Sequence, residues 1–264
     1  MATGMQEETI RKLGDSLFSA LLARHTIAPL TESHPAITIA DAYQISLRLL
    51  ENRLKRGERV IGKKIGVTSA AVMDMLNVRQ PDFGFMTNAM RYDDVMPIST
   101  LLIQPRAEGE IAFLLKEDLI GPGITREDVI AATAYVMPCF EVVDSRISDW
   151  KIKIQDTIAD NASCGLFTVN EKAGISPDSI DLANCKMTVT KNDQVISTGK
   201  GSAAMGHPAN CVAWLANTLS EYGISLNAGE IILSGSLVPL VPVSAGDVMT
   251  VAVDGMGECR VKFT

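Results

Sequence analysis

The sequence of 264 residues predicts an α+β fold in which a mainly helical part is followed by a part rich in short strands. Two observations carry this prediction. Apolar residues recur at helical spacing within the first sixty residues, whereas short β-branched runs separated by Gly, Pro, Asn and Asp dominate the remainder. Few helical patterns interrupt these runs, which argues against a doubly wound sheet. We therefore expect a helical part over residues 1–60 and a β-rich catalytic part over 61–264.

Two helices are expected in the N-terminal part. Residues 7–26 place four aliphatic side chains on one helical stripe. Thr38 and Asp41 have the spacing of a capping box, which predicts that a second helix begins there. Gly57 follows its last apolar position and is the expected C-terminal end of this helix.

Seven short strands are expected in the β-rich part. They span 60–67, 111–115, 136–143, 186–190, 195–198, 230–234 and 248–253. Residues 191–194 form a hairpin turn between two of them. Two helices interrupt the strands: one is capped by Thr125 with Asp128, and the other covers 208–223.

Charge and composition exclude several classes of function. The net charge is −7 and no basic face is apparent, so nucleic acid is not an expected partner. The longest apolar stretch, 231–243, is interrupted and too short to span a membrane. No basic-then-apolar signal opens the chain, and we expect a cytoplasmic protein. The five cysteines form no paired motif, which favours reduced thiols over a zinc or disulfide framework.

Three acidic residues are candidate ligands of a metal ion. If 106–113 begins a strand, Glu108 and Glu110 point to one face about 7 Å apart and repel each other unless a cation lies between them. Glu141 lies among apolar residues that predict burial, and a buried Glu is usually paired or metal-bound. Oxygen ligands without a histidine cluster suit Mg²⁺ or Mn²⁺ rather than Zn²⁺. The alternatives are two surface carboxylates, and a salt bridge from Glu141 to Arg146 or a nearby Lys.

The segment IGKKIGVTS contains a candidate catalytic lysine. As a strand it places Lys64 on one face with Gly62 and Gly66, and Lys63 on the other face with isoleucines. The glycine face leaves room for a ligand beside Lys64. An exposed strand lysine is the alternative, but it does not explain the paired glycines.

The remaining ionisable residues give weaker signals. Asp82 lies in QPDFG, which has the composition of a turn that this side chain could simply cap. The histidines lie in the helical N-terminal part or at a helix start, so we expect structural roles for them. These are His25, His34 and His207.

Six segments carry a family resemblance: IGKKIGVTS, QPDFG, PRAEGEIAF, FEVVDSRISDWKIKIQDTIADNASCGLF, GHPANCVAWLANTL and ILSGSLVPL. Together they closely resemble the vinylpyruvate (2-hydroxypenta-2,4-dienoate) hydratases of the fumarylacetoacetate hydrolase superfamily, which serve meta-cleavage degradation of aromatic compounds. The likeness covers about residues 7 to 264. It implies a helical N-terminal part, a mixed β-sandwich-like domain and a homo-oligomer. The superfamily's carboxylate motif falls on Glu108, Glu110 and Glu141.

The resemblance implies a hydro-lyase that converts 2-hydroxypenta-2,4-dienoate into 4-hydroxy-2-oxopentanoate. The metal would chelate the C2 oxygen and the C1 carboxylate of this 2-oxo/2-hydroxy-dienoic acid. Lys64 would donate a hydrogen bond or shuttle a proton, and Asp82 would act as acid and base at the distal carbons. Asn161, Ser163 and Ser236 are candidate substrate contacts, because they lie in polar segments with Gly or Ala neighbours.

Two alternatives stay open. The 4-oxalocrotonate decarboxylases of the same pathways share the metal site and often form a complex with the hydratase. Their counterpart of QPDFG lacks the acid, so Asp82 and the Lys63–Lys64 pair resemble the hydratases. Outside enzymes, the chain could be a scaffold for such a decarboxylase. The hydrolases of the superfamily often carry a lysine where this chain has 160–163, which contains none and speaks against carbon–carbon hydrolysis.

Overall fold

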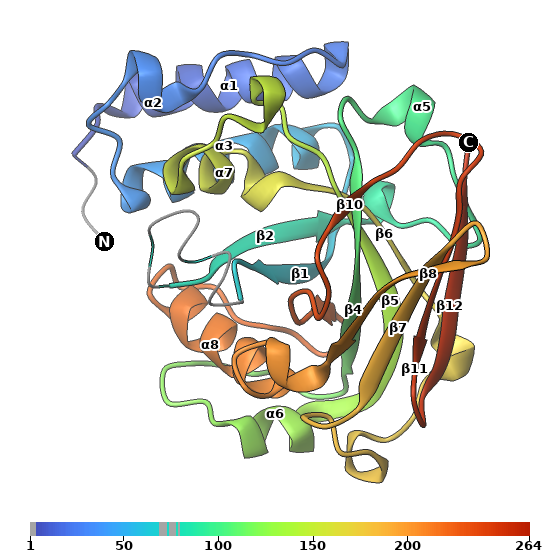
Figure 1. The fold of residues 1–264 in the computed structure, drawn as a ribbon. Coiled ribbons are helices and arrows are strands. Elements are labelled where there is room, and N and C mark those ends of the chain that lie inside the picture. Colours follow the sequence, from blue (N-terminus) through green and yellow to red (C-terminus); the bar gives the residue numbers. More distant parts are fainter. Residues whose placement is uncertain (1–3, 69–72, 74–77, 79) are drawn as a thin grey trace.

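The computed structural model describes residues 4–68, 73, 78 and 80–264, and it has the expected α+β fold (Figure 1). The N-terminal part consists of α1 (Glu7–Ala23), α2 (Leu30–Ser33) and α3 (Ile39–Lys55). The predicted capping box is present: the Thr38 hydroxyl accepts from the Asp41 N–H at 3.1 Å, and the Asp41 carboxylate accepts from the Thr38 N–H at 3.0 Å. Local sequence signals therefore located both long helices.

Two sheets form the rest of the fold. The larger sheet has the order β2 (Asp82–Thr87), β1 (Val60–Gly66), β9 (Ile231–Leu233), β4 (Arg106–Leu115), β5 (Thr133–Val143) and β6 (Cys164–Val169), with β10 (Val241–Pro242) paired to β4. The smaller sheet has the order β3 (Val95–Met96), β12 (Gly257–Phe263), β11 (Val248–Val253), β7 (Lys186–Lys191) and β8 (Gln194–Lys200). The predicted hairpin joins β7 and β8 through Asn192 and Asp193, both with positive φ.

The two sheets pack face to face. A methyl group built on Gly109 in β4 would lie 3.0 Å from Met187 Sδ and about as close to Val189 and Val251 of the smaller sheet. Gly109 therefore lies on the face of β4 that packs against the smaller sheet, and its neighbours Glu108 and Glu110 point to the opposite face. This packing confirms the predicted fold class, including its sandwich-like part.

Helices flank the β1–β2 part of the larger sheet, and Tyr43 of α3 stacks on Phe83, on the face of β2 opposite Asp82. In Figure 1, α1, α3 and α7 (Ile154–Ala159) lie above β1 and β2, while α8 (Pro208–Ser220) and α6 (Arg126–Ala132) lie below. The short α5 (Ile98–Leu101) leads into β4. Thr31 of α2 donates to the Asp156 carboxylate of α7 at 2.8 Å, so the N-terminal helices are tied to the later part of the chain. The division at residue 60 remains a prediction about domains.

The structure corrects the expectation for QPDFG. We expected a turn, but Asp82 begins β2, which pairs antiparallel with β1. In this register Asp82 lies opposite Gly66, and Gly84 lies opposite Lys64. Gly and Pro are local turn signals, whereas this strand is stabilised by pairing with a segment twenty residues away, which local composition does not report.

The larger sheet is strongly curled. Although β2 and β6 are its opposite edges, the turn that precedes β6 reaches β2, where Asn161 Oδ1 accepts from the Phe85 N–H at 2.8 Å. A methyl group on Gly84 would meet the Asn161 carbonyl, so the sheet curls toward the face of β2 that carries Asp82 and Gly84, and this face is concave. In the described part of the chain, no helix is long and apolar enough to cross a membrane.

Candidate metal centre and active site

The three predicted ligands meet on the concave face. Glu108 and Glu141 lie directly opposite each other on β4 and β5, and Glu110 follows two residues along on the same face. Oxygen atoms of the three carboxylates lie within 4.8 Å of one another. Glu110 and Glu141 are fully buried, and Glu108 is partly buried. We call these three residues the carboxylate cluster.

The carboxylate cluster has unmet polar groups. Glu110 Oε2 accepts from the Gly235 N–H at 2.8 Å, but Oε1 of Glu110 and both oxygens of Glu141 have no hydrogen-bond partner among the described residues. Burial and the charge of Glu141 raise the pKa of Glu108 to about 8, and the same causes raise the pKa of Glu110 well above its ordinary value. Buried, mutually repelling oxygens of this kind fit a hard divalent cation.

Lys64 faces the carboxylate cluster. Its Nζ lies 3.3 Å from Glu141 Oε1, an ion pair without the alignment of a hydrogen bond. Burial lowers the pKa of Lys64, but the charges of Glu141 and Asp82 outweigh that effect and raise it above its ordinary value. The ammonium therefore stays charged. A nearby lysine was one alternative for Glu141, and the structure shows that this pair and the cluster occur together.

Lys63 has a different environment. Its side chain leaves β1 on the other face and pairs with Glu230, with Nζ 2.5 Å from Oε2. Both groups are largely buried, and the Asn227 N–H also donates to Glu230. The strand period therefore separates a lysine at the site from a lysine in a structural ion pair.

Asp82 lies beside Lys64 on the same concave face. A methyl group built on Gly66 would lie 2.3 Å from Asp82 Oδ1 and 3.2 Å from Lys64 Nζ, so only glycine leaves room for both. Asp82 is 1% exposed, and its Oδ1 has no hydrogen-bond partner among the described residues. Burial raises the pKa of Asp82, although the charge of Lys64 opposes this.

The three candidate substrate contacts lie around this face but differ in their contacts. Ser236 lies beside Glu108 and donates to the Val238 carbonyl at 2.5 Å. Ser163 is buried, with its hydroxyl 3.1 Å from the Thr157 hydroxyl. The Asn161 amide is already used, because it accepts from the Phe85 N–H and donates to the Phe85 carbonyl. Substrate contact by these three residues remains a prediction.

Sequence reasoning missed two residues of the site. Gly235 has a φ of +95° and gives its N–H to Glu110. Thr68 is 6% exposed and lies against it, because a methyl group on Gly235 would be 2.4 Å from Thr68 Cγ2. The glycine in ILSGSLVPL was the available signal, since a glycine after a strand often permits close backbone approach.

Other residues have structural roles. Arg146, the second alternative partner of Glu141, pairs instead with Asp160 at 2.5 Å. His207 caps α8, where its Nδ1 accepts from the Ala209 N–H at 3.1 Å, in keeping with the expected structural role.

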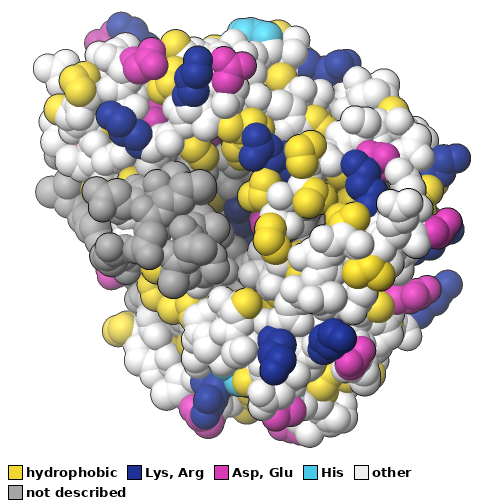
Figure 2. All heavy atoms as spheres, viewed as in Figure 1, with side chains coloured by type: hydrophobic (Ala, Val, Ile, Leu, Met, Phe, Trp, Pro, Cys, Tyr) yellow, Lys and Arg dark blue, Asp and Glu magenta, His cyan; other side chains and the backbone are white. Residues whose placement is uncertain are grey.

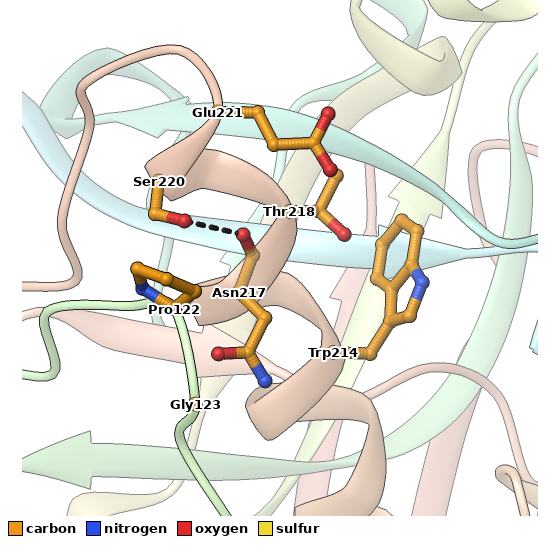
Figure 3. A pocket seen from close by; sticks show the side chains of 7 residues that line it. All are labelled: Pro122, Gly123, Trp214, Asn217, Thr218, Ser220 and Glu221. Carbon is orange, nitrogen blue, oxygen red and sulfur yellow. Dashed lines mark hydrogen bonds between the residues drawn. The ribbon is translucent and has the colours of Figure 1, made fainter.

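Figure 2 shows a hollow near the middle of the molecular face, with hydrophobic side chains gathered beside it. A separate pocket between α8 and Pro122–Gly123 contains none of the site residues (Figure 3).

Comparison with known proteins places this geometry in a family. The family model described as "Fumarylacetoacetate (FAA) hydrolase C-terminal" matches residues 65–264. The chain is 59% identical over 261 residues to a 2-hydroxyhexa-2,4-dienoate hydratase from Comamonas testosteroni, and this match covers 98% of each chain. It is 63% identical over 223 residues to a 2-hydroxypent-2,4-dienoate hydratase from Pseudomonas putida, which covers 84% of this chain and 100% of the relative.

A solved structure is similar over the whole chain. It is the 4-oxalocrotonate decarboxylase from Pseudomonas putida G7 complexed with magnesium and adipate, with 35% identity, a TM-score of 0.95 and 100% coverage of both chains. The family model and the full-length relatives confirm the resemblance found in the sequence: this chain belongs to the fumarylacetoacetate hydrolase family.

Proposed function

We propose that this chain is a divalent-metal-dependent hydro-lyase that adds water to 2-hydroxypenta-2,4-dienoate and yields 4-hydroxy-2-oxopentanoate in the meta-cleavage degradation of aromatic compounds. One observation carries the proposal: the carboxylate cluster, Lys64 and Asp82 converge on one buried concave face with several polar atoms unpaired. Unpaired buried groups are costly and are typical of sites that receive a ligand. The names of the hydratase relatives supply the substrate class.

Glu108, Glu110 and Glu141 would hold the metal ion. Among the described residues, this group of candidate ligands offers only carboxylate oxygens, which favour Mg²⁺ or Mn²⁺. When bound, such an ion supplies Lewis acidity toward the C2 oxygen and the C1 carboxylate of the substrate. The relative complexed with magnesium supports this choice.

Lys64 would stabilise charge on the C2 oxygen, and Asp82 would transfer protons. The charged ammonium of Lys64 is placed to donate a hydrogen bond to the C2 oxygen as negative charge develops there. Asp82 would give its proton to C5 while the C2 hydroxyl releases its proton to solvent, giving an α,β-unsaturated 2-oxo acid. Its carboxylate would then accept a proton from the water whose oxygen adds at C4, and C3 would take a proton from solvent, which replaces the one released from the C2 hydroxyl. The raised pKa of Asp82 favours the protonated form that starts this sequence.

A decarboxylase is the second candidate, because the similar decarboxylase shares the whole fold. The hydratase relatives are nearer in sequence, at 59% and 63% identity against 35%. We also propose that the protein is cytoplasmic and acts as a homo-oligomer, and that it can associate with 4-oxalocrotonate decarboxylase. Light scattering of the purified chain, alone and mixed with that decarboxylase, tests both associations.

The deciding experiment is an assay of the isolated chain with Mg²⁺ or Mn²⁺ on two substrates. We expect loss of 2-hydroxypenta-2,4-dienoate and no CO₂ from 2-oxohex-3-enedioate. Stoichiometric CO₂ without hydration would identify a decarboxylase, and no turnover of either would favour a scaffold. Because one relative is named for the hexadienoate, the ratio of kcat/KM for five- and six-carbon dienoates would define the chain length that is preferred.

A further inference from the structure

A left-handed turn lies between the helix α7 and the strand β6. Asn161, Ala162 and Ser163 have φ values of 56°, 50° and 53°. Residues with a Cβ rarely adopt this conformation, and three in succession need support from the surrounding structure. Strain of this kind tends to be retained where it positions a functional group.

Arg146 supplies that support from both ends of the turn. Its guanidinium donates to the Asp160 carbonyl at 2.6 Å before the turn and to the Cys164 carbonyl at 3.3 Å after it. It also pairs with the Asp160 carboxylate at 2.5 Å and donates to the Asp144 carbonyl at 2.6 Å. All these side chains are buried. We call Arg146, Asp144 and Asp160 the Arg146 node.

This turn also forms hydrogen bonds with the edge of β2. Asn161 offers one acceptor and one donor at the spacing of a peptide group, and both bind the free edge of β2 at Phe85, at 2.8 and 2.9 Å. The Asn161 carbonyl lies only 2.5 Å from the position of a methyl group on Gly84, so it lies directly against the strand. Gly84 is paired with Lys64, and Asp82 is two residues away.

We propose that Asn161 is a positioning residue for the reaction, which acts through β2 to hold Asp82 beside Lys64 and the carboxylate cluster. Asp82 depends on such help because its Oδ1 has no hydrogen-bond partner among the described residues, so the strand backbone sets where this oxygen lies. The Arg146 node connects β5, which carries Glu141, to the turn and thereby to β2. The inference rests on the proposed role of Asp82.

Asn161→Ala in the full-length protein with Mg²⁺ tests this inference. We expect kcat to fall by roughly tenfold to a hundredfold, as expected for a displaced catalytic group, while the magnesium Kd from calorimetry stays within about threefold. Asn217→Ala is the matched control, because Asn217 forms the same pair of bonds with the Ile124 backbone, both 2.8 Å, at the pocket of Figure 3. It should lower Tm comparably and leave kcat unchanged.

A double-mutant cycle tests the route through Asp82. In an Asp82→Asn background, Asn161→Ala should cause less than about a twofold further loss, since coupled residues are not additive. Gly84→Ala is a second variant that moves the turn but keeps the amide, and it should lower kcat in the same way. A wild-type kcat in Asn161→Ala, together with a strongly reduced but measurable kcat in Asp82→Asn, would refute the positioning role and leave the role of Asp82 intact. A wild-type kcat in Asp82→Asn would refute the proposed role of Asp82, and fully additive losses would refute the route through it.

Discussion

The carboxylate cluster and the Arg146 node are neighbouring buried regions that differ in how completely their charged groups are paired. At the node, the guanidinium meets one carboxylate and three backbone carbonyls, and Asp144 accepts from the N–H groups of Ile103 and Gln104. At the cluster, three oxygens have no hydrogen-bond partner among the described residues, and like charges face one another. Buried polar groups that are all paired are typical of a structural region, whereas unpaired ones leave hydrogen-bonding capacity for a ligand.

The largest effect is expected when the cluster loses one of its carboxylates. Glu110→Gln or Glu108→Gln should lower turnover by at least about a thousandfold while the fold survives, because the change removes repulsion without leaving a cavity. The metal-free variant should keep or raise its Tm, and added Mg²⁺ should no longer shift it. Turnover measured before and after exhaustive chelation is the check. Undiminished wild-type activity after chelation would refute the metal hypothesis.

The opposite result is expected at the node. Arg146→Met should destabilise the protein by about 3–5 kcal/mol, because it leaves Asp160 buried without its cation. Urea unfolding, followed by circular dichroism, measures this change against wild type. A variant as stable as Glu110→Gln would show that the contrast between the two regions does not hold.

The two lysines of β1 repeat the contrast within one strand. Lys64→Ala should reduce turnover by about a hundredfold or more, since it removes a charged donor at the site. Lys63→Ala should mainly reduce stability, because Glu230 would remain buried and unpaired. Steady-state kinetics and thermal melts of both variants separate the effects. Equal kinetic losses, or a larger loss at Lys63, would overturn the assignment.

The smallest effect is a graded dependence on pH. Burial and the charge of Glu141 raise the pKa of Glu108 from its ordinary 4.5 to about 8 in the metal-free protein. A raised carboxyl pKa contributes stability at low pH that is lost as pH rises from about 4.5 through about 8. Metal-free protein should therefore melt at lower temperature across this window, while Mg²⁺ affinity rises because bound protons are released. Melting curves and calorimetry at pH 5.5, 7 and 8.5 measure both trends, and a flat Mg²⁺ affinity would contradict the coupling.

The site was predictable to the extent that its signals are local. Glu108 and Glu110 share a face because strand side chains alternate, and the same rule separates Lys64 from Lys63. The capping boxes at Thr38 and Thr125 located helices, because each depends on four consecutive residues. The family resemblance supplied the reaction.

Tertiary structure decided the rest. The register of β4 on β5 places Glu141 opposite Glu108, and the curl of the sheet brings Lys64 within 3.3 Å of Glu141 although β9 and β4 lie between their strands. Asp82 was expected in a turn and lies in a strand because β1 pairs with it. The amide of Asn161 binds β2 from across the sheet. These contacts join residues far apart in the chain, and sequence periodicity describes only the geometry of near neighbours, so packing alone determined which charges meet and which remain unpaired.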